Sequence, residues 1–251
     1  SQTSAANIAV TATQGDVITS KATVVTPGTL SVTANSNAAQ TLVNDAGKLN
    51  AKQLDLKLSN LANTNGGEIV QTGTGATAIA MSGTLNNDGG RIASNGNLAL
   101  DAASLSNRSG SVQTTAGADL SLMARALANN SGGNILSRCN LSLQAGALNN
   151  DTGRVTAAGD ISSVIKGAAS NRGGTIAANG NTVLNAGSLD NSAGTVSGVN
   201  RVNMAVAGAL DNSAGTLVAN QALVLDAGSL DNAKGVVQSL QSTARLGVAE
   251  A

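Results

Sequence analysis

The sequence of 251 residues contains no histidine, phenylalanine, tyrosine or tryptophan, and it has one proline (Pro27) and one cysteine (Cys139). Without histidine, the commonest general base and the commonest zinc ligand are missing. Without aromatic rings, bases and sugars have no platform on which to stack. A single cysteine cannot form an intrachain disulfide. These absences disfavour an enzyme, and we predict no catalytic residue, no metal site and no cofactor.

Charge and hydropathy exclude two further classes of protein. The 14 basic and 14 acidic side chains cancel, so the chain lacks the basic surface of a nucleic-acid-binding protein. No run of about 18 or more apolar residues is present, and the first residues do not resemble a signal peptide. We therefore expect no nucleic-acid partner and no membrane span.

One phrase recurs along the chain: Leu-x-Asn-x-x-Gly-x, followed by Ile, Val or Leu. Clear copies lie at residues 42–49, 85–92, 105–112, 148–155, 189–196, 210–217 and 230–237. Two copies carry one extra residue, 61–69 and 127–135, and the copy at 169–176 has Ala169 in the leucine position. The asparagines assigned to these copies are Asn44, Asn63, Asn87, Asn107, Asn129, Asn150, Asn171, Asn191, Asn212 and Asn232. The first and last are 188 residues apart, so nine steps give a period of about 21 residues.

Between these copies lies a second phrase, Leu-x-Leu-x-Ala-x-x-Leu, at 98–105, 120–127, 141–148 and 223–230. Both phrases alternate apolar with small or polar residues, which is typical of strands with one buried face. Three strands of about five residues plus turns fill about 20 residues, which is too few for a propeller blade. We predict an all-β chain that folds as a parallel β-helix (β-solenoid) with three short strands per coil.

The repeated asparagine has two possible physical explanations. Identical amides stacked one strand spacing apart could form a ladder in which each amide donates to the next carbonyl. Alternatively, each asparagine could simply tolerate a left-handed turn conformation. We favour the ladder, because each asparagine follows two residues after an inward leucine.

Some positions depart from the repeat. Residues 1–41 lack the phrase and are expected to form divergent N-terminal coils of the same solenoid, while residues 42–251 form its regular part. Residues 160–169 lose the leucine phase, which predicts a local distortion. Cys139 stands where Gly96 and Gly159 stand in other copies, at a turn expected to need positive φ. Asp190, Asp211 and Asp231 share one repeat position and should form an acidic stripe.

The segments SLDNSAGTV, GALDNSAGTL and NLSLQAGALNNDTGRVTAAGD resemble the repeats of filamentous-haemagglutinin-like exoproteins, which include contact-dependent growth inhibition proteins of Gram-negative bacteria. The resemblance covers about residues 42 to 238. It implies a right-handed parallel β-helix that forms the shaft of a very long secreted protein at the cell surface. It also implies export through an outer-membrane transporter by two-partner secretion, and a role in adhesion or toxin delivery.

Three functions follow as hypotheses. The favoured one is a structural shaft that presents an adhesive or toxin-delivering tip to a receptor on a target cell. The alternative is a side-on adhesin, which binds a host glycan or protein through the surface of the rod. An enzyme is disfavoured, because catalytic β-helices need carboxylates that converge on one cleft, and here they are spread along the repeats.

Overall fold

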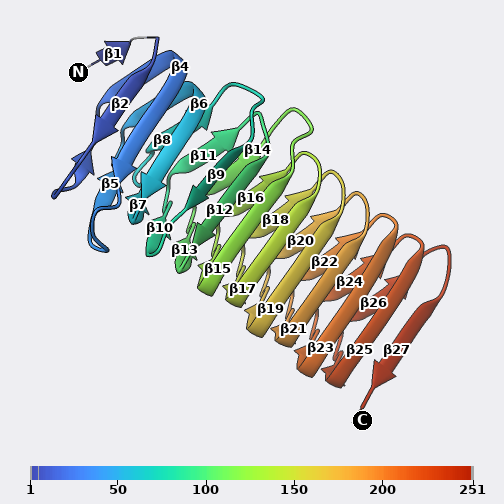
Figure 1. The fold of residues 1–251 in the computed structure, drawn as a ribbon. Coiled ribbons are helices and arrows are strands. Elements are labelled where there is room, and N and C mark those ends of the chain that lie inside the picture. The colour runs from blue at the N-terminus through green and yellow to red at the C-terminus, as the bar shows by residue number, and fades with distance from the viewer. Residues whose placement is uncertain (1, 5, 250–251) are drawn as a thin grey trace.

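The computed structural model describes residues 2–4 and 6–249. Every regular element in this part of the chain is a β-strand, and the strands form two long parallel sheets. Figure 1 shows the coils stacked along one rod, from the N-terminus in blue to the C-terminus in red. The predicted all-β parallel solenoid with a period of about 21 residues is confirmed.

The first sheet receives one strand from each successive coil, and neighbouring strands pair in parallel. At its N-terminal end, β1 and β2 both pair with β4. Its strands are β1 (Gln2–Ser4), β2 (Ile8–Thr11), β4 (Thr23–Ala34), β6 (Lys48–Leu58), β8 (Glu68–Gln71), β11 (Arg91–Ser94), β14 (Ser111–Thr114), β16 (Asn134–Ser137), β18 (Arg154–Ala157), β20 (Thr175–Ala178), β22 (Thr195–Gly198), β24 (Thr216–Ala219) and β26 (Val236–Ser239).

The second sheet supplies the remaining walls of the rod and is also parallel throughout. Its strands are β3 (Val17–Ile18), β5 (Thr41–Val43), β7 (Asn60–Ala62), β9 (Thr77–Ala80), β10 (Thr84–Asn86), β12 (Leu98–Ala102), β13 (Ser104–Ser106), β15 (Leu120–Asn129), β17 (Leu141–Asn149), β19 (Ile161–Ser170), β21 (Thr182–Asp190), β23 (Arg201–Asp211), β25 (Ala222–Asp231) and β27 (Ala244–Val248).

The number of strands per coil changes along the rod. The coil of β11, β12 and β13 has the three short strands that the sequence predicts. From β15 to β25, the second and third segments are joined in one strand that bends at a shift of register, as between Ala145 and Leu148 in β17. A Cβ on Gly146 at this bend would overlap the carbonyl oxygen of Ala126 in the preceding coil, so this position of β17 requires glycine. The coil therefore keeps three faces while it has only two separate strands.

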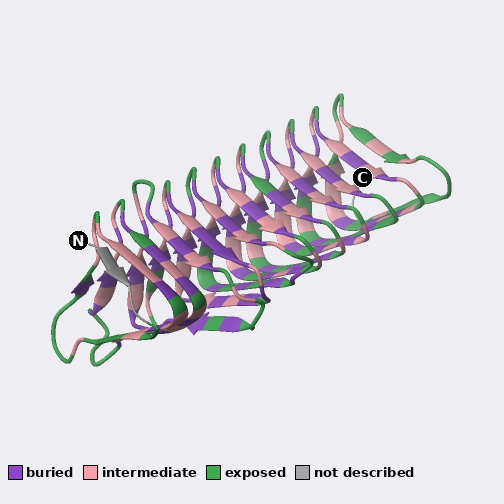
Figure 2. Ribbon diagram, turned by 90° about the horizontal axis from the view of Figure 1, so that it is seen from above, coloured by how far each residue is buried: buried purple, intermediate pink, exposed green. Residues whose placement is uncertain are grey.

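The core consists of columns of aliphatic side chains, one from each coil. In the first sheet Ile135, Val155 and Ile176 are paired in register, and each is at most 1% exposed. Figure 2 shows the buried residues along the walls of the rod and exposed residues at the turns. Because every coil buries the same positions, a single period governs the whole interior.

The described residues of the segment 1–41 lie on these same two sheets, since β4 pairs with β6 and β3 pairs with β5. Residues 1, 5, 250 and 251 of the two predicted segments lie outside the described residues.

The distortion expected at residues 160–169 is limited to one extra residue in β19, where the strand bends. Strand β19 is in register with β17 and β21 from Ile161 to Ile165, where Ser163 occupies the position of Leu143 and Leu184, and its register then shifts before Ala168. Ser163 is 1% exposed, and its hydroxyl has no hydrogen-bond partner. The pairing of the flanking residues maintains the strand, so the polar side chain of Ser163 occupies a position in the core.

This buried hydroxyl leads to a stability prediction. Replacing Ser163 with alanine removes an unsatisfied polar group, and we expect the free energy of unfolding to rise by about 1 kcal/mol. Ser162→Ala changes an exposed serine on the same strand and should leave stability within about 0.5 kcal/mol of the native chain. Urea denaturation followed by far-UV circular dichroism measures both. A loss of stability in Ser163→Ala would contradict the assignment of this side chain to the core.

Candidate functional site

A column of asparagine side chains runs through the rod next to a turn. At Asn87, the side-chain Nδ2 donates to Oδ1 of Asn107 in the next coil at 2.7 Å. The same Nδ2 also lies 3.2 Å from the carbonyl oxygen of Gly90 and 3.1 Å from that of Ser111. Each amide therefore binds its own turn and the coil that follows.

This contact repeats without a break, and we call the column the amide ladder. Each Nδ2 lies 2.7 Å from the Oδ1 of the next asparagine. Its members are Asn44, Asn63, Asn87, Asn107, Asn130, Asn150, Asn171, Asn191, Asn212 and Asn232. All but Asn232 are 0% exposed. At the first member, the hydroxyl of Thr19 donates to Oδ1 of Asn44 at 2.8 Å.

The structure corrects one predicted member, because Asn130 occupies the ladder in place of Asn129. The sequence prediction took Leu127 as the inward residue of this copy, but Leu127 is 40% exposed, while Ala128 is buried and pairs with Leu148. The extra residue therefore precedes the asparagine. Counting back three residues from Gly133 would have identified Asn130, because that spacing is shared by most copies.

Asn129 has a different contact at the outer side of the turn. Its Oδ1 accepts a hydrogen bond from the backbone N–H of Ser131 at 3.3 Å. Asn149 binds the N–H of Asp151 in the same way at 2.9 Å. The other side chains at this position that bind the N–H two residues later are Asn86, Asp190, Asp211 and Asp231. The position is a turn cap rather than part of the amide ladder.

The three aspartates predicted as an acidic stripe belong to this cap. Asp190, Asp211 and Asp231 are aligned in register on successive coils. Hydrogen bonds from the side chain and backbone of Ser213 hold the pKa of Asp211 below its usual value. Each of the three carboxylates closes its own turn.

The left-handed conformation lies at another position of the turn. Positive φ angles occur two residues after the ladder asparagine in most copies, for example 54° at Thr152 and 54° at Ala193. The ladder asparagines themselves are not among the residues with positive φ. Tolerance of a left-handed turn therefore does not explain why asparagine recurs.

The glycine of the repeat phrase is required by close approach. A Cβ on Gly153 would overlap the carbonyl oxygen of Asn130, and it would lie 2.7 Å from Oδ1 of Asn150. In the other copies from Gly67 to Gly235, the turn glycine meets the carbonyl oxygen of the preceding ladder asparagine and the Oδ1 of the asparagine in its own turn. Glycine is thus needed because the ladder brings backbone and amide together, and its φ is not the reason.

Two ion pairs join successive coils beside the ladder. Nη2 of Arg108 lies 2.7 Å from Oδ2 of Asp88, and Nη2 of Arg172 lies 2.8 Å from Oδ2 of Asp151. Burial raises the pKa of Asp88, but hydrogen bonds from Ser106 and Arg108 outweigh it and hold the pKa below its usual value. The pKa of Asp151 is lowered in the same way, where hydrogen bonds from Arg172 and Ser170 exceed the effect of burial.

Cys139 does not need the strained backbone that the sequence suggested. Neither Cys139 nor Gly96 is among the residues with positive φ. The N–H of Cys139 instead donates to the hydroxyl of Ser137 at 3.3 Å, which closes the turn with ordinary backbone angles. The thiol is free and half-buried, and a hydrogen bond to Asp119 raises its pKa.

The part of the chain that the structure describes contains no group of three or more His, Cys, Asp or Glu residues that could hold a metal ion. Within the same residues, no helix has the length and apolar character needed to cross a membrane.

Comparison with known proteins places these repeats in a family. The model of the haemagglutinin repeat matches residues 115–168, 164–214 and 196–248, which together are more than half of the chain. The chain belongs to the haemagglutinin-repeat family. The matched residues include the ladder from Asn130 to Asn232, so the amide ladder lies within the haemagglutinin repeats of this chain.

One relative is Toxin CdiA of Yersinia pestis, which is 56% identical over 66 residues. That match covers 26% of the present chain and 2% of the toxin, so the matched residues are a very small part of the relative's length. No solved structure matches the chain.

The corrected register can be tested with two adjacent asparagines. Asn130→Ala would leave the amide of Asn107 without its acceptor and the Oδ1 of Asn150 without its donor, inside the rod. We expect a loss of about 3 kcal/mol or more, because each unsatisfied buried group costs about 1–3 kcal/mol. Asn129→Ala removes only a turn contact and should cost about 1 kcal/mol or less. Urea midpoints compare the two variants, and equal losses would refute the register.

The ion pairs predict a dependence of stability on pH. Folding lowers the pKa of Asp88 and Asp151, so their contribution is present above the unfolded value of about 3.9 and is lost as the pH falls through the lower folded-state values. The double variant Asp88→Asn, Asp151→Asn should therefore lose less stability between neutral and acidic pH than the native chain.

Glu68→Gln, which removes a half-buried carboxylate 3.9 Å from Lys48, is the control for the loss of surface charge. Urea unfolding is measured for all three proteins over the same pH series. An acid dependence that is unchanged in the double variant would contradict the role of these pairs.

Proposed function

We propose that the chain is a segment of the shaft of a large secreted exoprotein at a bacterial cell surface, where the shaft presents an adhesive or toxin-delivering tip to a target cell. The observation that carries this proposal is the unbroken amide ladder from Asn44 to Asn232. It runs beside two continuous parallel sheets. A structure in which every coil is bonded to both neighbours is suited to hold its ends at a fixed separation.

The dimensions agree with a spacer. Ten ladder asparagines are separated by nine steps of about 4.8 Å, so the ladder alone extends about 43 Å. Bending the rod would separate backbone hydrogen bonds on one side of each coil and would disturb the buried amides. Each added coil therefore increases length without adding a flexible joint.

The comparisons support this proposal in two ways. A haemagglutinin repeat is named for adhesion, and the similar protein from Yersinia pestis is named a toxin. The shared segment is 2% of that toxin, which is what a short stretch of a long repetitive shaft would give. We further propose export through an outer-membrane two-partner secretion transporter, followed by contact with a receptor on the target cell.

A structural role also agrees with the state of the acidic side chains. Asp88 and Asp151 are paired with arginines, and Asp190, Asp211 and Asp231 close their own turns. Asp190 and Asp211 both line a groove of about 450 Å³, but each accepts a hydrogen bond from its own turn and is not free to act as the general acid or base of a glycosidase. We propose no enzymatic activity for this segment.

A second candidate is the side-on adhesin. It is favoured by a groove of about 520 Å³ along the second sheet, whose lining includes Asn97, Asp119, Asn140, Ser142 and Asp160. These groups could donate and accept hydrogen bonds with a host glycan or protein. The groove has no aromatic ring, so any sugar bound there would lack a stacking surface.

Deletion of whole coils distinguishes the two candidates in the exoprotein that carries this segment. Removing residues 150–190 joins Asn149 to Asn191 and keeps the turn phrase intact, so a shaft should still be exported and its tip should still act, with shorter reach. Removing residues 150–160 breaks the period and should reduce export. Surface labelling and target-cell binding are measured for both deletions.

Ser142→Arg gives the matched test of the groove, because it adds a long side chain to the groove without changing the length of the rod. Unchanged binding to target cells supports the shaft. A loss of binding with normal export and an intact tip would overturn the shaft proposal in favour of the side-on adhesin.

A further inference from the structure

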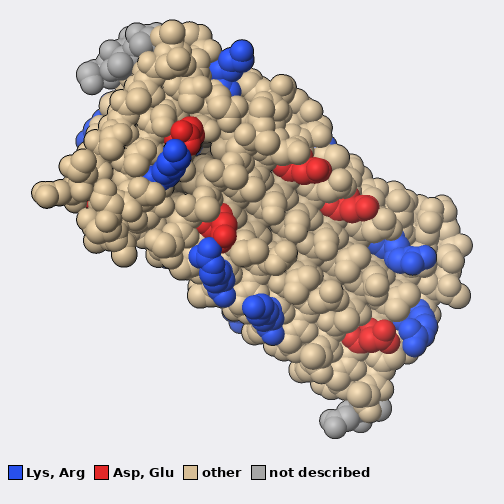
Figure 3. Space-filling model, in the orientation of Figure 1, with Lys and Arg blue, Asp and Glu red and all other residues tan. Residues whose placement is uncertain are grey.

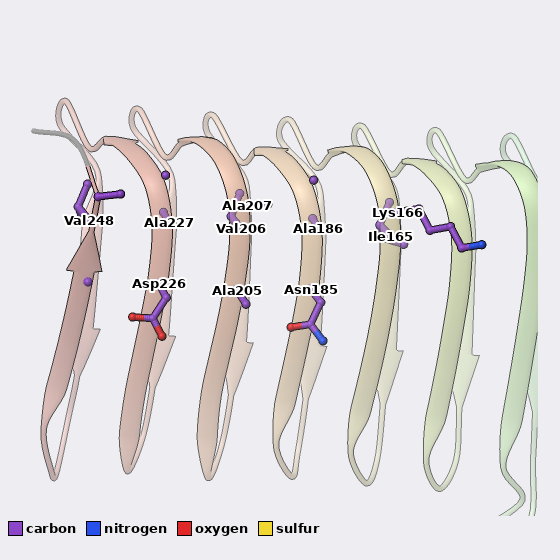
Figure 4. A pocket seen from close by; sticks show the side chains of 14 residues that line it. Ile165, Lys166, Asn185, Ala186, Ala205, Val206, Ala207, Asp226, Ala227 and Val248 are labelled. Carbon is purple, nitrogen blue, oxygen red and sulfur yellow. The ribbon is translucent and has the colours of Figure 1, made fainter.

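One face of the rod, formed by the second-sheet strands β17, β19, β21, β23, β25 and β27, carries few charges near its bend. A groove of about 750 Å³ runs along it, and many of its lining residues are glycine or alanine. Figure 3 shows wide uncharged areas between scattered charges on this side of the molecule. Figure 4 shows Lys166 toward one end of the groove and Asp226 toward the other, with Ala186, Ala205 and Ala207 between them.

The small residues at the bend are needed by the rod itself. A Cβ on Gly187 would lie 2.9 Å from the carbonyl oxygen of Gly167, and one on Gly228 would lie 2.8 Å from that of Ala207. Glycine here is therefore no sign of a ligand. The informative feature is the order of the larger and charged side chains that remain.

Two columns of side chains define this order. In the first, the outer column, the strand pairing places successive members in register: Gln144, Val164, Asn185, Ala205, Asp226 and Gly247. In the second, the bend column, each member lies two residues after the corresponding member of the outer column: Gly146, Lys166, Gly187, Ala207, Gly228 and Ala249. The outer column runs parallel to the rod axis, while the bend column lies where the register shifts, so that Gly228 approaches both Ala207 and Gly208 of the preceding coil.

The outer column is complementary to its own reverse at two of its three pairs of facing positions, and the third pair brings Val164 opposite Asp226 of the second copy. When it is laid against a second copy that runs in the opposite direction, the first position faces the last. Gln144 then faces Gly247 of the second copy, and Asn185 faces Ala205 of the second copy. In both cases a long polar side chain meets a small residue, which is the condition for two surfaces to interlock.

The same antiparallel arrangement brings the charged side chains Lys166 and Asp226 of the two copies near each other. Lys166 of the bend column would face Gly228 of the second copy, where no side chain obstructs it. Asp226 of the second copy lies two residues from that glycine, within the reach of a lysine side chain. In this structure Lys166 forms no ion pair within the described residues, and the nearest cation to Asp226 is the exposed Arg245 at 3.8 Å. A two-fold axis between β21 and β23 would make this contact twice.

We propose that this face binds a second copy of the chain in antiparallel orientation, with Lys166 of each copy paired to Asp226 of the other. Six coils at about 4.8 Å and a face about 20 Å wide give roughly 600 Å² on each copy, near the lower end for specific interfaces. The dimer is therefore weak. This inference does not depend on the proposed shaft function, although side-by-side shafts would follow from it.

The test is sedimentation equilibrium of the native chain from about 10 μM to about 1 mM, the range that covers a weak dimer. The native chain should show a monomer–dimer equilibrium. Lys166→Glu and Asp226→Lys should each raise Kd at least about tenfold, because like charges then meet across the interface. The double variant Lys166→Glu, Asp226→Lys should restore the native Kd, since it exchanges the two charges.

Arg154→Glu on the first sheet is the matched control, and it should leave Kd unchanged. Ala205→Arg fills the position opposite Asn185 of the second copy and should abolish the dimer, while circular dichroism verifies that the exposed substitution leaves the fold intact. A native chain that stays monomeric over the whole range would overturn the proposal. So would a double variant that associates no better than either single variant.

Discussion

The rod depends on keeping buried amides satisfied. A carboxamide inside a protein costs free energy unless its donors and acceptor are bound, because water is not available to replace a missing partner. In this chain the partner of each amide is the identical group one coil away, as between Asn150 and Asn171. The requirement can be met only if every coil begins its turn at the same position around the rod axis. The ladder therefore determines the register of the whole solenoid.

The other features of the turn follow from that register. The glycine three residues after Asn150 is needed because the carbonyl of the preceding asparagine comes close to it. The residue before that glycine carries the left-handed conformation, and even Thr152 adopts it. A β-branched residue is unfavourable at such an angle, which indicates that the ladder and its glycine outweigh local preference.

The period, the parallel pairing and nine of the ten ladder asparagines could be predicted from sequence, because a solenoid buries the same positions in each coil and the repetition is visible in the letters. The assignment of Asn129 to the ladder was wrong because the large Leu127 suggested an inward position, which the smaller Ala128 occupies instead. In this copy, the spacing of three residues between the asparagine and Gly133 indicates the ladder position more reliably than the size of the preceding side chain does. The loss of the leucine phase at Ser163 does not by itself distort the strand, since backbone pairing continues there and the register of β19 shifts only after Ile165.

The sequence contains no comparable pattern that would predict the bends of the strands or the ion pairs between coils. The join of two strand segments at Gly146 depends on a carbonyl from the preceding coil, which no local pattern reveals. The pairing of Asp88 with Arg108 likewise joins residues that are twenty positions apart. Such contacts depend on how coils lie over one another, so they become visible only when the coils are built.

The hydrogen bonds of the ladder all point the same way. Every amide from Asn44 to Asn212 donates toward the C-terminal neighbour, so nine aligned dipoles add along the axis and each polarises the next. The rod therefore has a dipole along its axis although its net charge is zero, and its two ends differ electrostatically. At the N-terminal end of the ladder, Oδ1 of Asn44 accepts a hydrogen bond from the hydroxyl of Thr19. At the C-terminal end, the side chain of Asn232 presents an N–H donor. The two extremities are not interchangeable, and a coil can join this array in only one orientation.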